Sequence, residues 1–158
     1  MLPVEDVLPD LLAALETRGE AVLVAPPGAG KTTRVAPALL NAPWAKNGKI
    51  ILLSPRRIAA RTAAARMAFE RAEPVGATIG YRVRLDSKIG RETRIEVVTE
   101  GVFTRMILED PELRGVAVVV FDEFHERSLE GDFGLVLARE AQGALRPDLK
   151  LIVMSATL

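Results

Sequence analysis

Residues 25–33 read Ala-Pro-Pro-Gly-Ala-Gly-Lys-Thr-Thr and follow a short apolar run at 21–24. Gly28 and Gly30 permit backbone angles and close approaches that a side chain would block. A helix is expected to begin at Lys31, so that backbone amides and the positive end of the helix dipole converge on one point. A strand, a glycine-rich turn and a helix in this order predict a phosphate-binding loop within an α/β fold.

The two residues after the second glycine supply the chemistry that such a loop needs. Lys31 can reach the β- and γ-phosphates of a nucleoside triphosphate, and the hydroxyl of Thr32 can ligate Mg²⁺. Ala25 occupies the first-glycine position of the general motif, and this leaves the phosphate cradle itself intact. The competing interpretation is an ordinary helix that follows a glycine turn.

An acidic pair follows the most strand-like run of the chain, residues 116–121. Ligands bind at the carboxyl ends of strands in open α/β sheets, and this run would deliver Asp122 and Glu123 to such an edge. One carboxylate can hold Mg²⁺, and the next can orient and deprotonate an attacking water. By itself the pair could equally be the acidic first turn of a helix. Beside the phosphate loop it predicts a magnesium-dependent nucleoside triphosphatase.

The chain offers few ligands for a soft metal ion. It contains one histidine, His125, and no cysteine, so a zinc site is not expected. A lone histidine is more often a hydrogen-bonded bystander than a catalyst. The absence of cysteine also excludes a disulfide scaffold and suits a reducing cytosol, and we therefore expect a cytoplasmic protein.

The composition is typical of one globular domain. The 158 residues are 49% hydrophobic, which is enough for a packed core. The 21 basic and 21 acidic side chains balance, so the net charge gives no indication of a nucleic-acid partner. No apolar run approaches the roughly 20 residues that a membrane span needs, and we expect neither a membrane partner nor a signal peptide.

Apolar runs that alternate with helical periodicity predict a mostly parallel sheet with helices on both faces. A polar turn is expected at 86–91. With no repeat, low-complexity tract or linker, residues 1–158 are expected to form a single domain. The predicted strands are 21–24, 50–53, 77–83, 95–98, 116–121 and 151–154, and the predicted helices include 8–15, 58–72, 102–109, 133–141 and one that starts at 31.

Further short motifs occur from residue 20 onward. Residues 122–125 read Asp-Glu-Phe-His, and residues 155–157 read Ser-Ala-Thr. Ser-Pro-Arg-Arg-Ile-Ala-Ala stands at 54–60, Gly-Tyr-Arg-Val-Arg at 80–84 and Thr-Glu-Gly at 99–101. In type and order this set resembles the DEAH/RHA group of superfamily 2 helicases, and the phenylalanine in the acidic motif resembles the bacterial HrpB-like members.

The resemblance implies a RecA-like domain that binds ATP and Mg²⁺, together with a role for each matching residue. Asp122 would hold the metal with Thr32, Glu123 would be the general base, and His125 would act with Ser155 and Thr157 to couple the γ-phosphate to a second motor domain. Arg66 matches an arginine that stacks on adenine, although an exposed helix arginine is an equally good interpretation. The implied triphosphate-binding residues are Pro27, Gly28, Ala29, Gly30, Lys31, Thr32 and Thr33, and the implied nucleic-acid contacts are Arg57, Arg84, Thr99 and Arg105.

The same resemblance implies partners and an activity. Such helicases use two RecA-like domains on single-stranded nucleic acid, here expected to be RNA rather than DNA, and no second domain is present in these 158 residues. We therefore expect the chain alone to bind nucleotide, to hydrolyse it slowly and not to unwind duplexes. Two other hypotheses are a nucleotide-gated module that binds nucleic acid or protein without turnover, and a small kinase with the same loop.

Overall fold

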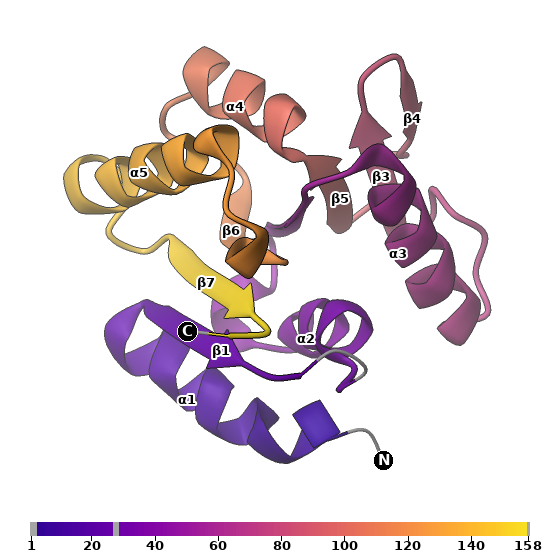
Figure 1. The fold of residues 1–158 in the computed structure, drawn as a ribbon, viewed down its shortest axis with the longest axis horizontal. Helices are drawn as coiled ribbons and strands as arrows, with labels where there is room; N and C mark the ends of the chain where they lie inside the picture. The colour runs from indigo at the N-terminus through magenta and orange to yellow at the C-terminus, as the bar shows by residue number, and fades with distance from the viewer. Residues whose placement is uncertain (1–2, 27–28, 158) are drawn as a thin grey trace.

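The computed structural model describes residues 3–26 and 29–157, which build one seven-stranded sheet with the order β1-β7-β6-β2-β5-β3-β4 (Figure 1). Every neighbouring pair is parallel except β3 and β4. The predicted α/β class and mostly parallel sheet are thus confirmed. The strands are β1 (Glu20–Val24), β2 (Lys49–Ser54), β3 (Ile79–Val83), β4 (Asp86–Lys88), β5 (Ile95–Thr99), β6 (Val116–Phe121) and β7 (Lys150–Ser155).

The described residues form five α-helices, of which the first precedes the sheet and the other four connect strands. They are α1 (Leu8–Arg18), α2 (Lys31–Leu39), α3 (Arg57–Glu70), α4 (Glu100–Glu109) and α5 (Leu129–Ala144). The described residues also form three short 3₁₀ turns: η1 (Pro3–Val7) before α1, and η2 (Pro43–Ala45) and η3 (Phe124–Glu126) between later helices. Gly19, with a φ of 78°, ends α1 in the left-handed region that glycine adopts without strain. Among the described residues, no helix is both long and apolar enough to cross a membrane.

The sheet separates two hydrophobic cores. Apolar side chains of α1, α2 and α3 pack on one face, where they meet strand residues such as Ile50 and Leu52. Side chains of α4 and α5 pack on the other face against the alternate residues Ile51 and Leu53. Figure 1 shows the same division, with α4 and α5 on one side of the strands and α1 and α2 on the other. Burial on both faces explains why the central strands read as continuous apolar runs.

One predicted detail is wrong. The polar turn expected at 86–91 contains β4, which pairs antiparallel with β3, and the two loop residues of this hairpin are Arg84 and Leu85. The sequence of β4 shows no apolar alternation because it is an edge strand with a single neighbour. The helix predicted at 133–141 is α5, on which Phe133 and Val136 are 47% and 57% exposed. The buried stripe of α5 is formed by Gly131, Gly134, Ala138 and Ala141, which let the helix approach its neighbours closely.

A half-buried arginine secures the amino-terminal edge of the sheet. Arg146 follows α5, and its guanidinium donates to three backbone carbonyls in the loop that leads into β6. It also pairs with Asp148 at 2.9 Å. These bonds close the 112–116 loop against the segment that begins β7. The accepting carbonyls are those of Glu112, Leu113 and Val116.

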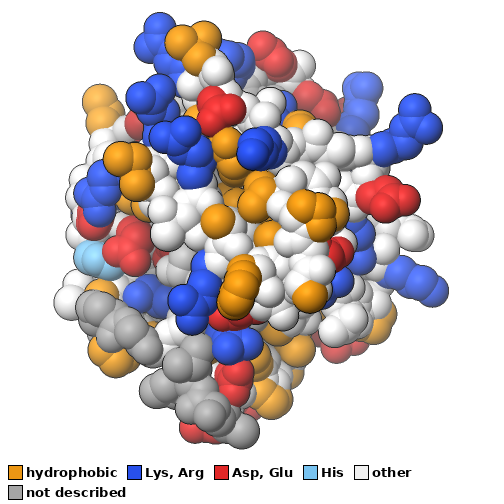
Figure 2. Space-filling model, turned by 90° about the vertical axis from the view of Figure 1, so that its right-hand side faces the viewer, with side chains coloured by type: hydrophobic (Ala, Val, Ile, Leu, Met, Phe, Trp, Pro, Cys, Tyr) orange, Lys and Arg blue, Asp and Glu red, His pale blue; other side chains and the backbone are white. Residues whose placement is uncertain are grey.

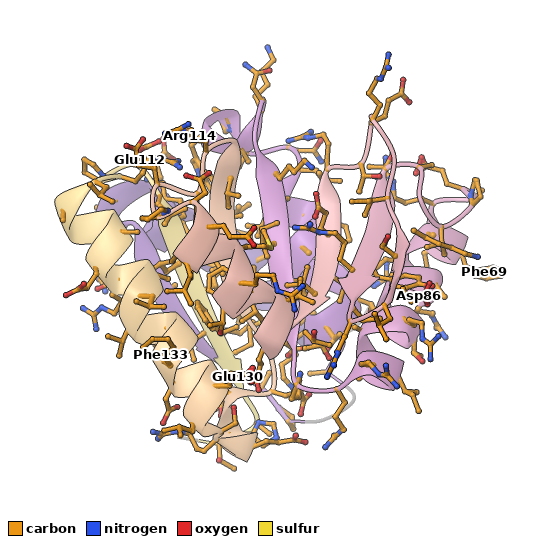
Figure 3. The ribbon with its side chains drawn as sticks, turned by 90° about the horizontal axis from the view of Figure 1, so that it is seen from above. Phe69, Asp86, Glu112, Arg114, Glu130 and Phe133 are labelled. Carbon is orange, nitrogen blue, oxygen red and sulfur yellow. The ribbon has the colours of Figure 1, made fainter. Side chains whose placement is uncertain are left out.

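We expect Arg146→Ala to lower the free energy of unfolding by about 2–3 kcal/mol, because several carbonyls lose a charged donor. Urea denaturation monitored by circular dichroism measures the change. Arg114→Ala is the control, since Arg114 projects into solvent from the same region (Figure 3) and makes only long ion pairs of 3.8–3.9 Å. It should cost less than about 0.5 kcal/mol. Equal losses in the two variants would contradict the structural role of Arg146.

Candidate active site

The sheet order brings the ends of three strands together. β7 lies between β1 and β6, with Val24 opposite Ser155 and Phe121 opposite Val153. Because the three strands are parallel, their carboxyl ends meet at one edge of the sheet. The amide of Ala25, where the glycine-rich segment begins, donates to the carbonyl of Ser155 at 3.0 Å. The glycine-rich segment, the acidic pair and the Ser-Ala-Thr segment therefore leave the sheet side by side.

The loop that follows β1 turns directly into α2. Gly30 is the N-cap residue with a φ of 92°, a left-handed conformation that favours glycine. A glycine has no side chain to cap the helix, so the first amides of α2 can bind an anion. Pro27 and Gly28, two of the predicted phosphate-binding residues, lie outside the described residues, whereas Ala29 is buried.

Lys31 and Thr32 begin α2 and lie beside the acidic pair, as the sequence predicts. The hydroxyl of Thr32 donates to Asp122 Oδ2 at 2.8 Å. Lys31 is only 4% exposed, and its charge lies close enough to Asp122 to favour the ionised carboxylate. A buried ammonium group is costly unless a negative group compensates it. The negative charge of Asp122 therefore compensates the buried positive charge of Lys31. Thr33 is half-buried in the same turn.

Asp122 is held in place by backbone and side-chain bonds at the end of β6. It is 6% exposed, its own amide donates to the carbonyl of Leu53 at 3.1 Å, and its Oδ1 accepts the amide of Glu123 at 2.8 Å. Burial raises the pKa of Asp122, and the hydrogen bond from Thr32 opposes this rise. The Asp122 carboxylate and the Thr32 hydroxyl are hard oxygen donors of the kind that Mg²⁺ prefers, and the positive charge of Lys31 lies nearby.

The residues after Asp122 form a tight turn. Glu123 has a φ of 55° and Arg127 a φ of 37°, so a non-glycine residue in the left-handed region stands on each side of η3. Such conformations are uncommon for these residue types and persist only where the surrounding contacts impose them. The guanidinium of Arg127 pairs with Asp132 at 2.7 Å, and Arg56 pairs with Glu126 at 3.0 Å.

His125 connects this turn to the end of β7. Its Nδ1 accepts the amide of Ala156 at 3.0 Å, which leaves the proton on Nε2, and Nε2 lies 3.2 Å from Glu123 Oε2. The side chains of Glu123, His125 and Glu126 place ligand atoms within 4.8 Å of one another. The Nδ1 lone pair of His125 accepts the Ala156 amide and Nε2 carries the proton, so the neutral ring has no free lone pair for a metal ion.

Ser155 and Thr157 form a local turn next to that histidine. The Ser155 hydroxyl donates to the carbonyl of Thr157 and accepts the Thr157 amide at 3.1 Å. Ser155 is buried and Thr157 is exposed. The structure thus places the Ser-Ala-Thr segment against the acidic turn through the amide of Ala156 and the ring of His125.

The four predicted nucleic-acid contacts lie in two places. Thr99 is the N-cap residue of α4 and stands opposite Ser54, three residues before Arg57 at the start of α3. Arg84 and Arg105 line one open groove of about 410 Å³ between the β3–β4 hairpin and α4. Figure 2 looks onto the side that carries this hairpin and shows exposed Lys and Arg side chains with acidic and apolar groups between them.

Arg66 lies on α3 and is linked to the helix that follows the phosphate loop. It pairs with Glu70 at 3.0 Å, and Glu70 lies 3.5 Å from Arg34 on α2. Arg34 also lies 3.7 Å from Glu5 in η1. The side chain of Arg66 is 67% exposed. An aromatic ring can therefore reach its guanidinium without displacing a packed neighbour.

The protein-family model described as DEAD/DEAH box helicase matches residues 5–158. The chain belongs to this family. The chain is 56% identical over 157 residues to the ATP-dependent RNA helicase HrpB of Escherichia coli strain K12, covering 99% of the chain and 19% of that protein. It is 42% identical over 152 residues to the Arabidopsis thaliana DExH-box ATP-dependent RNA helicase DExH3, covering 94% and 13%.

A solved structure agrees with this family membership. The crystal structure of the Escherichia coli DEAH/RHA helicase HrpB superposes with a TM-score of 0.96 at 56% identity, over 100% of this chain and 20% of that one. The RecA-like fold expected from the helicase motifs is thus confirmed. The chain spans about a fifth of the length of these two HrpB chains.

Some residues of the helicase domain that support the site were not predicted. Glu100 and Ser128 join α4 to the end of the acidic turn, and Arg56 anchors Glu126. Ser128 is the N-cap residue of α5, with its hydroxyl accepting the amide of Gly131, and its residue type is a recognised signal for that position. The two side-chain pairs have no such signal, because each joins segments that are far apart in the sequence.

Proposed function

We propose that this chain is the ATP-binding and ATP-hydrolysing first motor domain of an ATP-dependent RNA helicase. The observation that carries the proposal is the 2.8 Å hydrogen bond from Thr32 to Asp122, which joins the start of the phosphate-loop helix to the acidic strand end. The names of the relatives, which are ATP-dependent RNA helicases, support the choice of ATP and RNA.

In this proposal the amides at the start of α2 bind the phosphates of ATP, and the buried Lys31 neutralises the β- and γ-phosphate oxygens. Thr32 and Asp122 would hold Mg²⁺, which neutralises charge on the phosphates when bound. Pro27, Gly28, Ala29, Gly30 and Thr33 would complete the cradle. Arg66 would stack on the adenine from α3.

Glu123 performs the chemical step of the proposed reaction. Its carboxylate orients a water and takes a proton from it as the water oxygen attacks the γ-phosphorus. The bond from that phosphorus to the bridging oxygen breaks, and ADP leaves. Nε2 of His125 lies 3.2 Å from Glu123 Oε2, and Nδ1 accepts the Ala156 amide, so a change at the γ-phosphate would reach the Ser-Ala-Thr segment through one ring.

The proposed helicase includes a second RecA-like domain. In comparable phosphate chemistry an arginine supplied from outside the phosphate site accelerates the reaction by about 10³–10⁵. The coverage of only 19% of the Escherichia coli relative supports a partner domain of this kind. The 158-residue chain alone should therefore bind nucleotide, hydrolyse it slowly and leave duplexes wound.

Two substitutions test the nucleotide site. Lys31→Ala should abolish binding of a fluorescent ATP analogue, because the phosphates lose their buried cation. Glu123→Gln should leave the dissociation constant within about threefold and abolish residual phosphate release, because the amide cannot accept the proton from water. The exposed residues Lys46 and Glu112 provide the matched controls Lys46→Ala and Glu112→Gln, which should behave as wild type.

Equal nucleotide affinity in wild type and Lys31→Ala would refute the phosphate-loop assignment. Nucleotide binding without any phosphate release, with or without single-stranded RNA, would favour a binding module that needs no turnover. Transfer of labelled phosphate to a small acceptor would favour a kinase.

The proposed RNA contacts are tested by the salt dependence of binding. Arg84→Ala and Arg105→Ala should each weaken binding of single-stranded RNA and lower the slope of log K against log salt by about 0.7, the value for one lost phosphate contact on a single strand. Arg139→Ala is the control, because this exposed arginine lies on α5, away from the groove. Unchanged slopes in both groove variants would contradict the assignment, and tighter binding of the matched DNA oligonucleotide would overturn the choice of RNA.

A further inference from the structure

The amino-terminal ends of α4 and α5 approach each other closely because each helix has a glycine near its start. A Cβ atom added at Gly131 would lie 2.5 Å from Glu100 Oε2 and 2.9 Å from Ser128 Oγ. One added at Gly101 would lie 3.0 Å from Glu130 Oε2. Figure 3 shows Glu130 at the end of α5 that takes part in this junction. A larger residue at position 131 would have to displace these side chains.

A pair of hydrogen bonds crosses the junction. The Ser128 hydroxyl donates to Glu100 Oε1 at 2.8 Å and accepts the amide of Gly131 at 2.9 Å. The hydroxyl has one proton, and this proton is directed to Glu100. The same atom therefore caps α5 and holds the first residue of α4. Glu100 directly follows Thr99, the proposed RNA contact at the end of β5.

Ser128 is also the residue at which the acidic turn ends. The turn contains left-handed backbone at Glu123 and Arg127, and contacts from other segments hold it in place. These contacts come from Arg56 to Glu126, from Ala156 to His125, and from Glu100 to Ser128. A strained turn that is held from outside can adopt a second conformation when one of its anchors changes.

We propose that Glu100 is a positioning residue that couples the nucleotide site to the RNA-facing end of α4. This inference rests on the proposed function, since it assumes that Glu123 responds to the γ-phosphate. The path is short and consists of atoms in contact: Glu123 begins the turn, Ser128 ends it, and Glu100 joins Ser128 to Thr99. A change in the turn shifts Ser128, and the carboxylate of Glu100 transmits the shift to the first turn of α4.

The junction can be disturbed without touching ATP or RNA. Gly131→Ala adds a methyl group that meets the side chains of Glu100 and Ser128 rather than the backbone. Gly143→Ala is the matched control, because it adds the same methyl group to the same helix at a position with no described atom within 4 Å. Both substitutions replace glycine by alanine within α5, and both raise its intrinsic helix propensity. A difference between the two variants therefore reports the crowded junction, which includes the Glu100 carboxylate and the Ser128 hydroxyl that caps α5.

The readout is amide hydrogen exchange of residues 99–106 in the 158-residue chain, with and without Mg²⁺ and a non-hydrolysable ATP analogue. In wild type and Gly143→Ala, the nucleotide should change exchange in this segment by about fivefold or more, the lower end of common coupling factors. In Gly131→Ala the change should fall to within error, while the dissociation constant of the analogue stays within about twofold.

A second pair of variants separates positioning from packing. Glu100→Gln keeps an oxygen that accepts the Ser128 hydroxyl and should retain the nucleotide-dependent exchange, whereas Glu100→Ala should lose it. This pair also decides the question if Gly131→Ala fails to fold. Retention of the wild-type response in Glu100→Ala would overturn the inference.

The failure of the inference is distinct from the failure of the proposed function. If wild type does not bind the analogue, the proposed function itself is wrong. If wild type binds the analogue and exchange in residues 99–106 does not change, the proposed function stands and the coupling through Glu100 is refuted.

Discussion

The hydrogen bond from Thr32 to Asp122 joins two segments that are 90 residues apart in the chain. It depends on the strand order, because β1 and β6 must flank β7 for the two side chains to meet. It also depends on burial, since an exposed hydroxyl and carboxylate would exchange partners with water at little cost. Because Asp122 is buried, its carboxylate needs protein partners in place of water. These partners are Thr32, the amide of Glu123 and the nearby charge of Lys31.

The turn after Asp122 is where the helicase motifs meet. The Ser-Ala-Thr segment contacts it at His125, Arg56 contacts it at Glu126, and the Thr-Glu-Gly segment contacts it at Ser128. The turn has few hydrogen bonds of its own, because it consists of a single 3₁₀ turn with a positive-φ residue on each side. Its conformation is therefore set by its neighbours, and this gives a physical reason for motifs that are scattered in sequence to lie together in space.

The sequence predicts most of the sheet and the site for a simple reason. Strands buried on both faces must be apolar throughout, and such runs are visible without a structure, as at 50–53 and 116–121. The phosphate loop is equally visible, because a glycine-rich turn followed by lysine and threonine, between a strand and a helix, is typical of a phosphate-binding loop. The ends of α1 and α4 are readable because Gly19 and the Asp110-Pro111 pair end helices by known rules, whereas α5 extends from Leu129 to Ala144, beyond the predicted 133–141.

The remaining features depend on contacts that no local pattern encodes. β4 is polar and short, so it resembles a turn until β3 is placed beside it. The positive φ of Glu123 cannot be read from a glutamate, and the small-residue stripe of α5 is recognisable only once α4 lies against it. Arg84 and Arg105 likewise line one groove only because the β3–β4 hairpin lies next to α4.

A double-mutant cycle tests the central claim most directly. Thr32→Val and Asp122→Asn, singly and together, are compared for Mg²⁺-dependent affinity for an ATP analogue by titration calorimetry. If the two side chains act as one site, the losses will be non-additive, with an interaction free energy of about 1 kcal/mol or more. Additive losses, within about 0.5 kcal/mol, would contradict the account.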